Sequence, residues 1–440
     1  MTLNFAEILA QNRSVLAGLG ISALGLPLVF ARRPRVLLER VLLFVVVALL
    51  LTRFVARARE GELPWDLRVF HEAGQLARAG VDPYSLPLQQ NPPTSLQNPP
   101  TALPLYEILS IFPFPIAARI WQLLSLAGLF LLVPLAWQLL HTSSLDPPRG
   151  PFPNAMSACV AGSLAASWGL DAGQMAVWTT VWLYVALWMR QHAWLTGMAL
   201  ALASIKPATM LPVMILFVRR KDLHVWAALV LGVVALCVLG SNPAELPIRI
   251  VGNLRNIQID RLPGAINDYS FSAPFHDDLI SVDRFLYCLG LRNRSVISGL
   301  QGMILFALVA WLVWDLWTER LSPDSPHTLS LIFILACLFL YHRLYDAIVL
   351  AVPLTVAADQ ARRAYGWRRA GYALTVVGLL LVLNFPRGKG IRQLAAWSET
   401  AGLLGWSVQA IVLPYPIWIL LFTYLFMRWA APRLPRKAGN

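Results

Sequence analysis

The sequence predicts an all-α polytopic membrane protein, a bundle of about 11–13 transmembrane helices, in a single membrane domain over residues 1–440. Of the 440 residues, 57% are hydrophobic and 13% are charged, whereas about a quarter of a soluble domain is charged. The hydrophobic residues also gather in runs near the ~20 residues that cross a bilayer, such as VLLFVVVALLL at residues 41–51. Composition and run length together exclude an ordinary soluble enzyme.

The apolar runs define candidate spans in order along the chain. The first run lacks the layout of a signal peptide, so we expect it to remain as a helix. The run 99–116 is short and rich in proline, and it either crosses the membrane or only dips into it. The four cysteines lie far apart, so neither a zinc site nor a disulfide framework is expected. The candidate spans are 14–30, 36–55, 99–116, 120–140, 155–170, 175–189, 195–217, 224–240, 297–317, 328–357, 371–385 and 404–428.

Basic residues in short loops set the predicted orientation, because Lys and Arg concentrate on the cytoplasmic side of membrane proteins. The net charge of +13 is therefore attributed to basic residues in cytoplasmic loops, and no nucleic-acid partner is expected. Two long polar segments, 56–98 and 241–296, then lie on the extracytoplasmic side. The basic clusters are Arg32, Arg33, Arg35 and Arg40; Arg219, Arg220 and Lys221; Arg362, Arg363, Arg368 and Arg369; and Arg428, Arg433, Arg436 and Lys437.

The apolar stretch 328–357 is interrupted by Tyr341-His342-Arg343-Leu344-Tyr345-Asp346. A single span through this stretch would place the basic cluster at 362–369 outside. A hairpin whose polar tip faces the extracytoplasmic half keeps that cluster inside, and interrupted helices are tolerated where they line a water-filled cavity. We therefore favour the hairpin.

The first outer segment contains a predicted amphipathic helix at 66–79, lying on the membrane surface. Val69, Phe70 and Ala73 recur at helical spacing, and Gly80 ends the helix. Asp66 begins it, where free amides and the helix dipole favour an ionised carboxylate, the state that a general base needs. Asp is also a preferred helix cap, so spacing alone leaves a catalytic role and a capping role open.

Three short motifs follow one another in the first half of the chain. The first is Asp66-x-x-Val69-Phe70 with Ala73-Gly74, Gly80-x-Asp82-Pro83-Tyr84 and Asn98-Pro99-Pro100. The second is Gly173-Gln174, and the third is Ala203-Ser204-Ile205-Lys206-Pro207 after Gly197. This ordered set resembles glycosyltransferase family 87, membrane enzymes that include mannosyltransferases dependent on polyprenol-phosphate mannose.

The resemblance implies a GT-C fold, Asp66 as catalytic base, and Tyr84 and Gln174 in substrate binding. It also implies a sugar donor carried on polyprenyl phosphate. One carboxylate is enough for this chemistry, since the acceptor hydroxyl must lose a proton while the phosphate leaves as a stabilised anion. We therefore expect transfer of a hexose, with mannose carried over from the family, to a lipid or glycan hydroxyl with inversion. No cofactor and no metal are expected.

Two polar positions inside apolar runs are candidates for binding the phosphate. Lys206 is flanked by apolar residues, where a charge is costly, so contact with a phosphate or cavity competes with snorkelling as its explanation. In the hairpin tip, Arg343 is a candidate bidentate phosphate ligand, and His342 is a candidate for orienting the sugar or the phosphate. An internal Arg343–Asp346 pair is the structural alternative.

The second outer segment carries His276-Asp277-Asp278, residue types that can bind a divalent ion. Adjacent acids in a long loop are more commonly solvated, so no metal is assigned to them. The loop is instead expected to close over the donor or the acceptor. Asp171, just before Gly173-Gln174, is interpreted as structural.

The leading interpretation is a hexosyltransferase of the bacterial cytoplasmic membrane, in contact with membrane lipids, with its active site on the extracytoplasmic side. The alternative is a transporter or flippase of lipid-linked saccharides, which would also need the buried charges of Lys206 and Arg343. The two interpretations differ in their need for Asp66, because Asn at this position removes a base but little volume.

Overall fold

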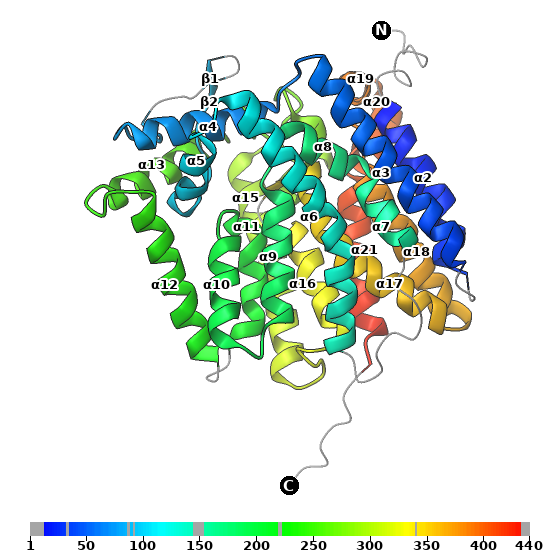
Figure 1. The fold of residues 1–440 in the computed structure, drawn as a ribbon. Helices are drawn as coiled ribbons and strands as arrows, with labels where there is room; N and C mark the ends of the chain where they lie inside the picture. Colours follow the sequence, from blue (N-terminus) through cyan, green and yellow to red (C-terminus); the bar gives the residue numbers. More distant parts are fainter. Residues whose placement is uncertain are drawn as a thin grey trace.

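The computed structural model describes residues 13–31, 35–85, 89–90, 93–143, 154–218, 222–338 and 341–432. These residues are mostly helical, with strands of only two or three residues, which confirms the predicted all-α class. Figure 1 shows most helices side by side in a bundle, while α4 (Trp65–Arg78), α5 (Leu103–Leu109) and α13 (Leu246–Ile259) cross one end of it. Helices from both predicted outer segments thus lie at the same end.

Long apolar helices within the described residues identify a multi-pass membrane protein. Five are long and apolar enough to span a bilayer, or six if the bent pair at Gly402–Val412 and Tyr415–Ala430 is one span. Shorter apolar helices of 10–17 residues accompany them. The total of about 11–13 spans stays a prediction. The five long helices are Val36–Arg59, Phe114–Thr142, Arg294–Trp317, Leu344–Arg363 and Gly366–Leu383.

The first two helices, α2 (Arg13–Val29) and α3 (Val36–Arg59), match the first two predicted spans closely. On α3, Leu37 is 75% exposed and Phe44 is 72% exposed. Such a continuous apolar surface is stable when lipid rather than water surrounds it. The helix also continues past the predicted end at residue 55, so the first outer segment begins inside it.

The amphipathic helix predicted at 66–79 is confirmed as α4. Its apolar face, including Leu67, Phe70 and Ala73, is buried, largely against α5. Gly74 permits the contact, since a Cβ at this position would lie 2.1 Å from the backbone oxygen of Tyr106. The run 99–116 folds as a 3₁₀ turn and the seven-residue α5, which is too short to cross a membrane.

Two candidate spans are broken. The run 195–217 breaks where Pro207 predicts it, whereas the prediction of one unbroken helix over 155–170 was wrong. The run 155–170 divides into α7 (Asn154–Ala161) and α8 (Leu164–Ala172), and the side chain of Ser163 caps α8. The run 195–217 divides at Lys206 into α10 (Ala193–Ala203), α11 (Pro207–Met210) and the 3₁₀ helix η2 (Leu211–Phe217). Proline at 207 has no amide hydrogen with which to continue the preceding helix.

The stretch 328–357 forms two helical arms around a polar break, as the hairpin prediction requires. One arm is α16 (Pro326–Leu338), and the other is η5 (Leu344–Leu350) with α17 (Ala351–Arg363). Between them, β4 (Tyr341–Arg343) pairs antiparallel with β3 (Leu279–Ser281) of the second outer segment. This short ribbon joins the hairpin tip to that segment. Both arms are almost fully buried and form the centre of the hydrophobic core.

The other elements complete the bundle and its two ends. Among them, α18, α19 and α20 follow the hairpin, and α21 ends the described chain. Their bounds are η1 Pro100–Ala102, α6 Phe114–Ser143, α9 Ala176–Trp188, α12 Leu223–Leu239, η4 His276–Asp278, α14 Val282–Cys288, α15 Arg294–Trp317, α18 Gly366–Leu383, α19 Lys389–Ser398, α20 Gly402–Ser407, η6 Val408–Val412, α21 Tyr415–Ala430, β1 Gln89–Gln90 and β2 Pro93–Thr94.

Candidate active site

A cavity of about 640 Å³ brings together most of the predicted site residues. Its wall is formed by the start of α4, the segment 95–99, α8, the break before α11, α13 and the hairpin tip. The volume lies within the range of small-molecule sites in proteins. Asp66, Gln174, Lys206, His342 and Arg343 all line it.

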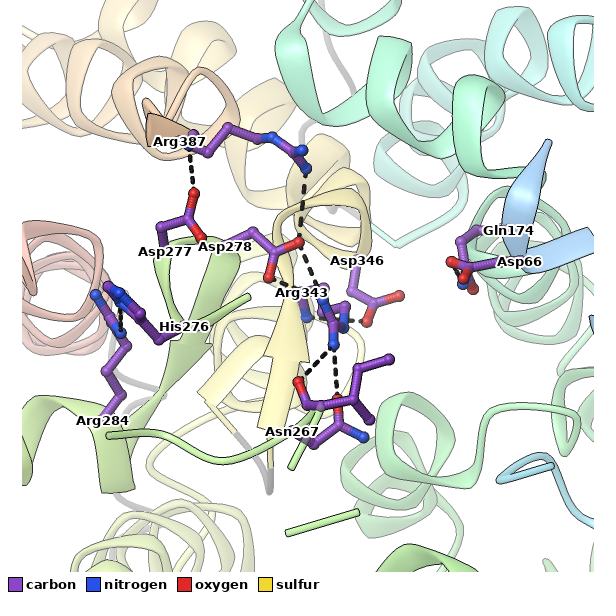
Figure 2. Close-up of polar contacts among 12 residues, drawn as sticks. Asp66, Gln174, Asn267, His276, Asp277, Asp278, Arg284, Arg343, Asp346 and Arg387 are labelled. Atoms are coloured by element: carbon purple, nitrogen blue, oxygen red, sulfur yellow. Dashed lines mark hydrogen bonds and ion pairs between the residues drawn. The ribbon is translucent and has the colours of Figure 1, made fainter. Parts of the chain in front are cut away.

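Asp66 lies in the first turn of α4 but does not cap that helix. The N-cap position is Pro64, and no side chain makes a capping hydrogen bond there. Instead the Asp66 carboxylate accepts a hydrogen bond from the Gln174 side-chain amide, as Figure 2 shows. The capping interpretation of Asp66 is therefore wrong, and the carboxylate is directed to the cavity.

Gly173 explains how Gln174 reaches Asp66. It ends α8 in the left-handed conformation, with φ of 74°, which costs a residue with a Cβ about 1–2 kcal/mol. A Cβ at this position would also lie 2.7 Å from the Cβ atoms of Pro64 and Leu67. Only glycine lets the end of α8 approach the start of α4 so closely, which places the Gly-Gln motif beside the carboxylate.

Desolvation dominates the electrostatics of Asp66. The side chain stays partly open to the cavity, but the surrounding protein shields it from bulk water, and this raises the pKa of the carboxyl above its ordinary value. The Gln174 hydrogen bond and the charges of Arg343 and Lys206 act in the opposite direction. The helix start was expected to favour ionisation; burial outweighs it. A raised pKa makes the deprotonated carboxylate a stronger base.

Lys206 is held in the cavity wall by an ion pair. Its ammonium group pairs with Asp346 and lies 4.8 Å from the centre of the Tyr345 ring. The Lys206 side chain is only 16% exposed, so it does not snorkel to a membrane surface. The Nδ1 atom of His342 lies 3.3 Å from the other carboxylate oxygen of Asp346, so Asp346 orients both residues.

Arg343 is fixed by the second outer segment rather than by Asp346. Its Nη1 atom donates to both Asp278 oxygens, at 3.0 and 3.2 Å, and its Nη2 atom donates to the Asn267 side chain at 2.9 Å (Figure 2). The backbone amide of Arg343 donates to Asp346, at 3.3 Å. Asp346 thus pairs with Lys206, while the Arg343 side chain binds Asp278 and Asn267.

The His276-Asp277-Asp278 triplet is buried, which corrects the prediction that its acids are solvated. Each side chain has a different basic partner. His276 lies 3.1 Å from Arg284, Asp277 lies 3.1 Å from Arg392, and Asp278 binds Arg343. The three side chains thus diverge, and no group of three potential ligands for a metal occurs among the described residues.

Two further predicted residues lie away from the cavity wall. The Tyr84 hydroxyl donates to the carbonyl of Asn98 at 2.8 Å and so supports the 95–99 segment, while Tyr84 is not among the residues that line the cavity. Its role in substrate binding stays a prediction. Asp171 pairs with Arg53 at 2.5 Å and with Arg57 at 2.8 Å. This agrees with its interpretation as structural, because the pairs tie α8 to α3.

The structure adds to the site residues that the sequence analysis did not place there. Asp278 and Asn267 line the cavity and orient Arg343, and Asp346 holds Lys206. Trp65 and Trp168 also line it, with ring centres 4.6 Å apart. The sequence marked these acids only as charged residues in an apolar run or in an outer segment. It could not show their pairing, because Asp278 lies 65 residues from Arg343 in the chain and Asp346 lies 140 residues from Lys206.

The edge of the cavity near α11 is apolar and open. Pro207 and Leu211 line it, and Leu211 is 46% exposed. Ile257 of α13 and Ile205 line the same cavity. A hydrocarbon chain attached to a polar ligand fits such an edge, because its apolar surface is removed from water there.

Comparison with known proteins gives one family. The sequence model of glycosyltransferase family 87 matches residues 96–341, which is more than half of the chain. The matched region contains Gln174, Lys206 and Asp278, while Asp66 precedes it and Arg343 follows it. No curated protein matches the chain.

Proposed function

Because the chain belongs to glycosyltransferase family 87, we propose that this membrane glycosyltransferase moves a hexose, with mannose as the first candidate, from polyprenyl phosphate to the hydroxyl of a lipid or glycan acceptor. The observation that carries the proposal is a single cavity that holds the Asp66 carboxylate, the basic groups of Lys206 and Arg343, and an apolar edge.

Asp66 is the proposed general base. Lys206 and Arg343 each contact a partner carboxylate, whereas the contact of Asp66 among the described residues is the neutral amide of Gln174. Its second carboxylate oxygen can therefore accept the acceptor's proton. As that proton leaves, the acceptor oxygen forms a bond to the anomeric carbon, and the bond from this carbon to the phosphate oxygen breaks. A single displacement of this kind inverts the configuration.

The donor phosphate is assigned to the side of the cavity that carries Lys206 and Arg343. The departing group takes the electron pair as a phosphate anion and needs no general acid, so positive charge is the help it requires. The proposed polyprenyl chain leaves along the apolar edge at Pro207 and Leu211. His342, oriented by Asp346, is assigned to contact the sugar or the phosphate.

The proposed location is the extracytoplasmic face of the bacterial cytoplasmic membrane. Support comes from the arrangement in Figure 1, where α4 and α13 of the two predicted outer segments lie at one end of the bundle. The cavity lies between this layer and the helices beneath it, within reach of both segments.

The test is transfer by purified protein of radiolabelled sugar from synthetic polyprenyl phosphates to a membrane-lipid extract. Asp66→Asn should bind the donor and lose turnover by a factor of about 10²–10⁴, the usual contribution of a general base. Glu72→Gln, a carboxylate change on the same helix and outside the cavity, should keep activity. Equal transfer by Asp66→Asn and wild type would overturn the assignment, and saccharide transport retained by Asp66→Asn without any transfer would favour a carrier.

A further inference from the structure

Asp278 lies between two arginines. It accepts two hydrogen bonds from Arg343, and its Oδ2 atom lies 3.5 Å from the Nη1 atom of Arg387. Figure 2 shows the three side chains as a row, with Asp278 in the middle and Asp66 apart from them. Arg343 and Asp278 line the cavity, whereas Arg387 is not among the lining residues.

Arg387 comes from a part of the chain that neither the family match nor the sequence motifs include. It lies in the turn between α18 and α19, which is anchored where the Gly388 amide and Arg392 bind Asp277. Arg387 is largely buried over the ring of Trp168. Burial lowers its pKa to about 10, so the guanidinium is charged at neutral pH.

One carboxylate cannot neutralise two guanidinium groups. The row Arg343–Asp278–Arg387 therefore carries one net positive charge, while the neighbouring Lys206–Asp346 and Arg261–Asp283 pairs are balanced. If Arg387 were absent, Asp278 would balance Arg343 alone. The field of Arg343 in the cavity would then be that of a neutral ion pair, which attracts an anion much less.

The geometry points to Arg387 as a positioning residue for donor binding: it shares Asp278 with Arg343 and so leaves positive charge at the cavity wall for the anionic phosphate of the donor. Arg387 acts through Asp278 and need not touch the ligand. This inference rests on the proposed function, because it assumes that a lipid phosphate binds near Arg343.

The test measures binding of farnesyl phosphate and of uncharged farnesol to the purified full-length protein. Arg387→Met should weaken farnesyl phosphate binding about tenfold and leave farnesol binding unchanged. In the transfer assay the KM for donor should rise while kcat changes little. Arg387→Lys, which keeps the charge, should restore most of the affinity. Arg292→Met is the control, since Arg292 is exposed, donates to the backbone carbonyl of Tyr287 and lies outside the cavity lining, and it should bind like wild type.

A second substitution distinguishes loss of charge from misfolding as the cause of weaker binding in Arg387→Met. Asp278→Asn removes the neutralising charge, so in the Arg387→Met background it should recover farnesyl phosphate affinity, and alone it should bind at least as tightly as wild type. Unchanged affinity in Arg387→Met, or weaker binding in Asp278→Asn, overturns the inference. Wild type that does not prefer farnesyl phosphate to farnesol instead contradicts the proposed donor, so the two failures are distinguishable.

Discussion

The carboxylates of the cavity have different partners, and this separates their roles. Asp278 and Asp346 each bind a cation, so their charges are used in holding Arg343 and Lys206. Asp66 binds the amide of Gln174. A neighbouring cation lowers the pKa of a carboxyl and makes the carboxylate a weaker base. Asp66 has a neutral amide as its neighbour, so it is better suited than Asp278 or Asp346 to accept a proton.

The pH dependence of transfer should report on this environment. The base must be deprotonated, so activity falls as pH drops through the pKa of Asp66, which burial raises. Gln174→Leu removes a hydrogen bond that lowers this pKa, so the acidic limb of the rate profile should move to higher pH. The measurement is kcat/KM for acceptor against pH. Gln138→Leu, at an exposed position on α6, should leave the limb in place; a shift in both variants would contradict this explanation.

The Lys206–Asp346 pair should matter for stability as well as binding. Lys206→Met leaves the buried Asp346 without its cation and should lower the free energy of unfolding by about 2–3 kcal/mol. Lys206→Met combined with Asp346→Asn should recover part of that stability but not activity. Arg190→Met breaks a pair with the exposed Asp324 and should cost about 1 kcal/mol or less. Thermal unfolding in detergent should rank the stabilities of the variants, with Lys206→Met lowest, the double variant above it, and Arg190→Met nearest to wild type.

At the scale of elements, the site depends on places where helices stop. The end of α8 supplies Gln174, the break before α11 supplies Lys206, and the interruption between α16 and η5 supplies His342 and Arg343. Irregular backbone is tolerated at membrane depth where it lines a cavity. The places where the apolar helices are interrupted are therefore the places where they line the cavity.

The contact of α8 with α4 can be tested with two glycines of similar conformation. Gly173→Ala combines a left-handed backbone with a Cβ 2.7 Å from Pro64 and Leu67, so it should separate Gln174 from Asp66 and abolish most transfer. Gly80→Ala has a φ of 72° and open space around it, so it should cost only about 1–2 kcal/mol of backbone strain and retain activity. Equal activity in the two variants would show that the close approach is unimportant.

At the scale of the whole molecule, local patterns predicted more than distant pairings did. The spacing of Val69, Phe70 and Ala73 predicted α4, and a charge within an apolar run marked Lys206. The partners of Lys206 and Arg343 could not be predicted, because β3–β4 pairing and helix packing set them across long stretches of chain. The break at Ser163 was missed because both halves of its run are equally apolar, whereas Pro207 marks the break at Lys206.

Orientation is a property of the whole chain, and the buried native cysteines permit a labelling test. Pro263→Cys lies in the second outer segment and Thr318→Cys follows α15, and both positions are exposed. A membrane-impermeant maleimide should label Pro263→Cys in intact cells and Thr318→Cys only after permeabilisation. The reverse pattern would place Asp66 and the cavity on the cytoplasmic side.

The β3–β4 ribbon limits how the second outer segment can move. Leu279 is paired with Arg343 and Ile280 with His342, so a swing of this segment as a lid would drag the hairpin tip with it. If the donor is lipid-linked as proposed, the ribbon favours its entry and exit sideways, past α11, while the Arg343 guanidinium stays where β4 holds it. An inhibitor with a short branched hydrocarbon tail is therefore expected to block this route by binding at the apolar edge formed by Pro207 and Leu211, without reaching the charged residues of the cavity.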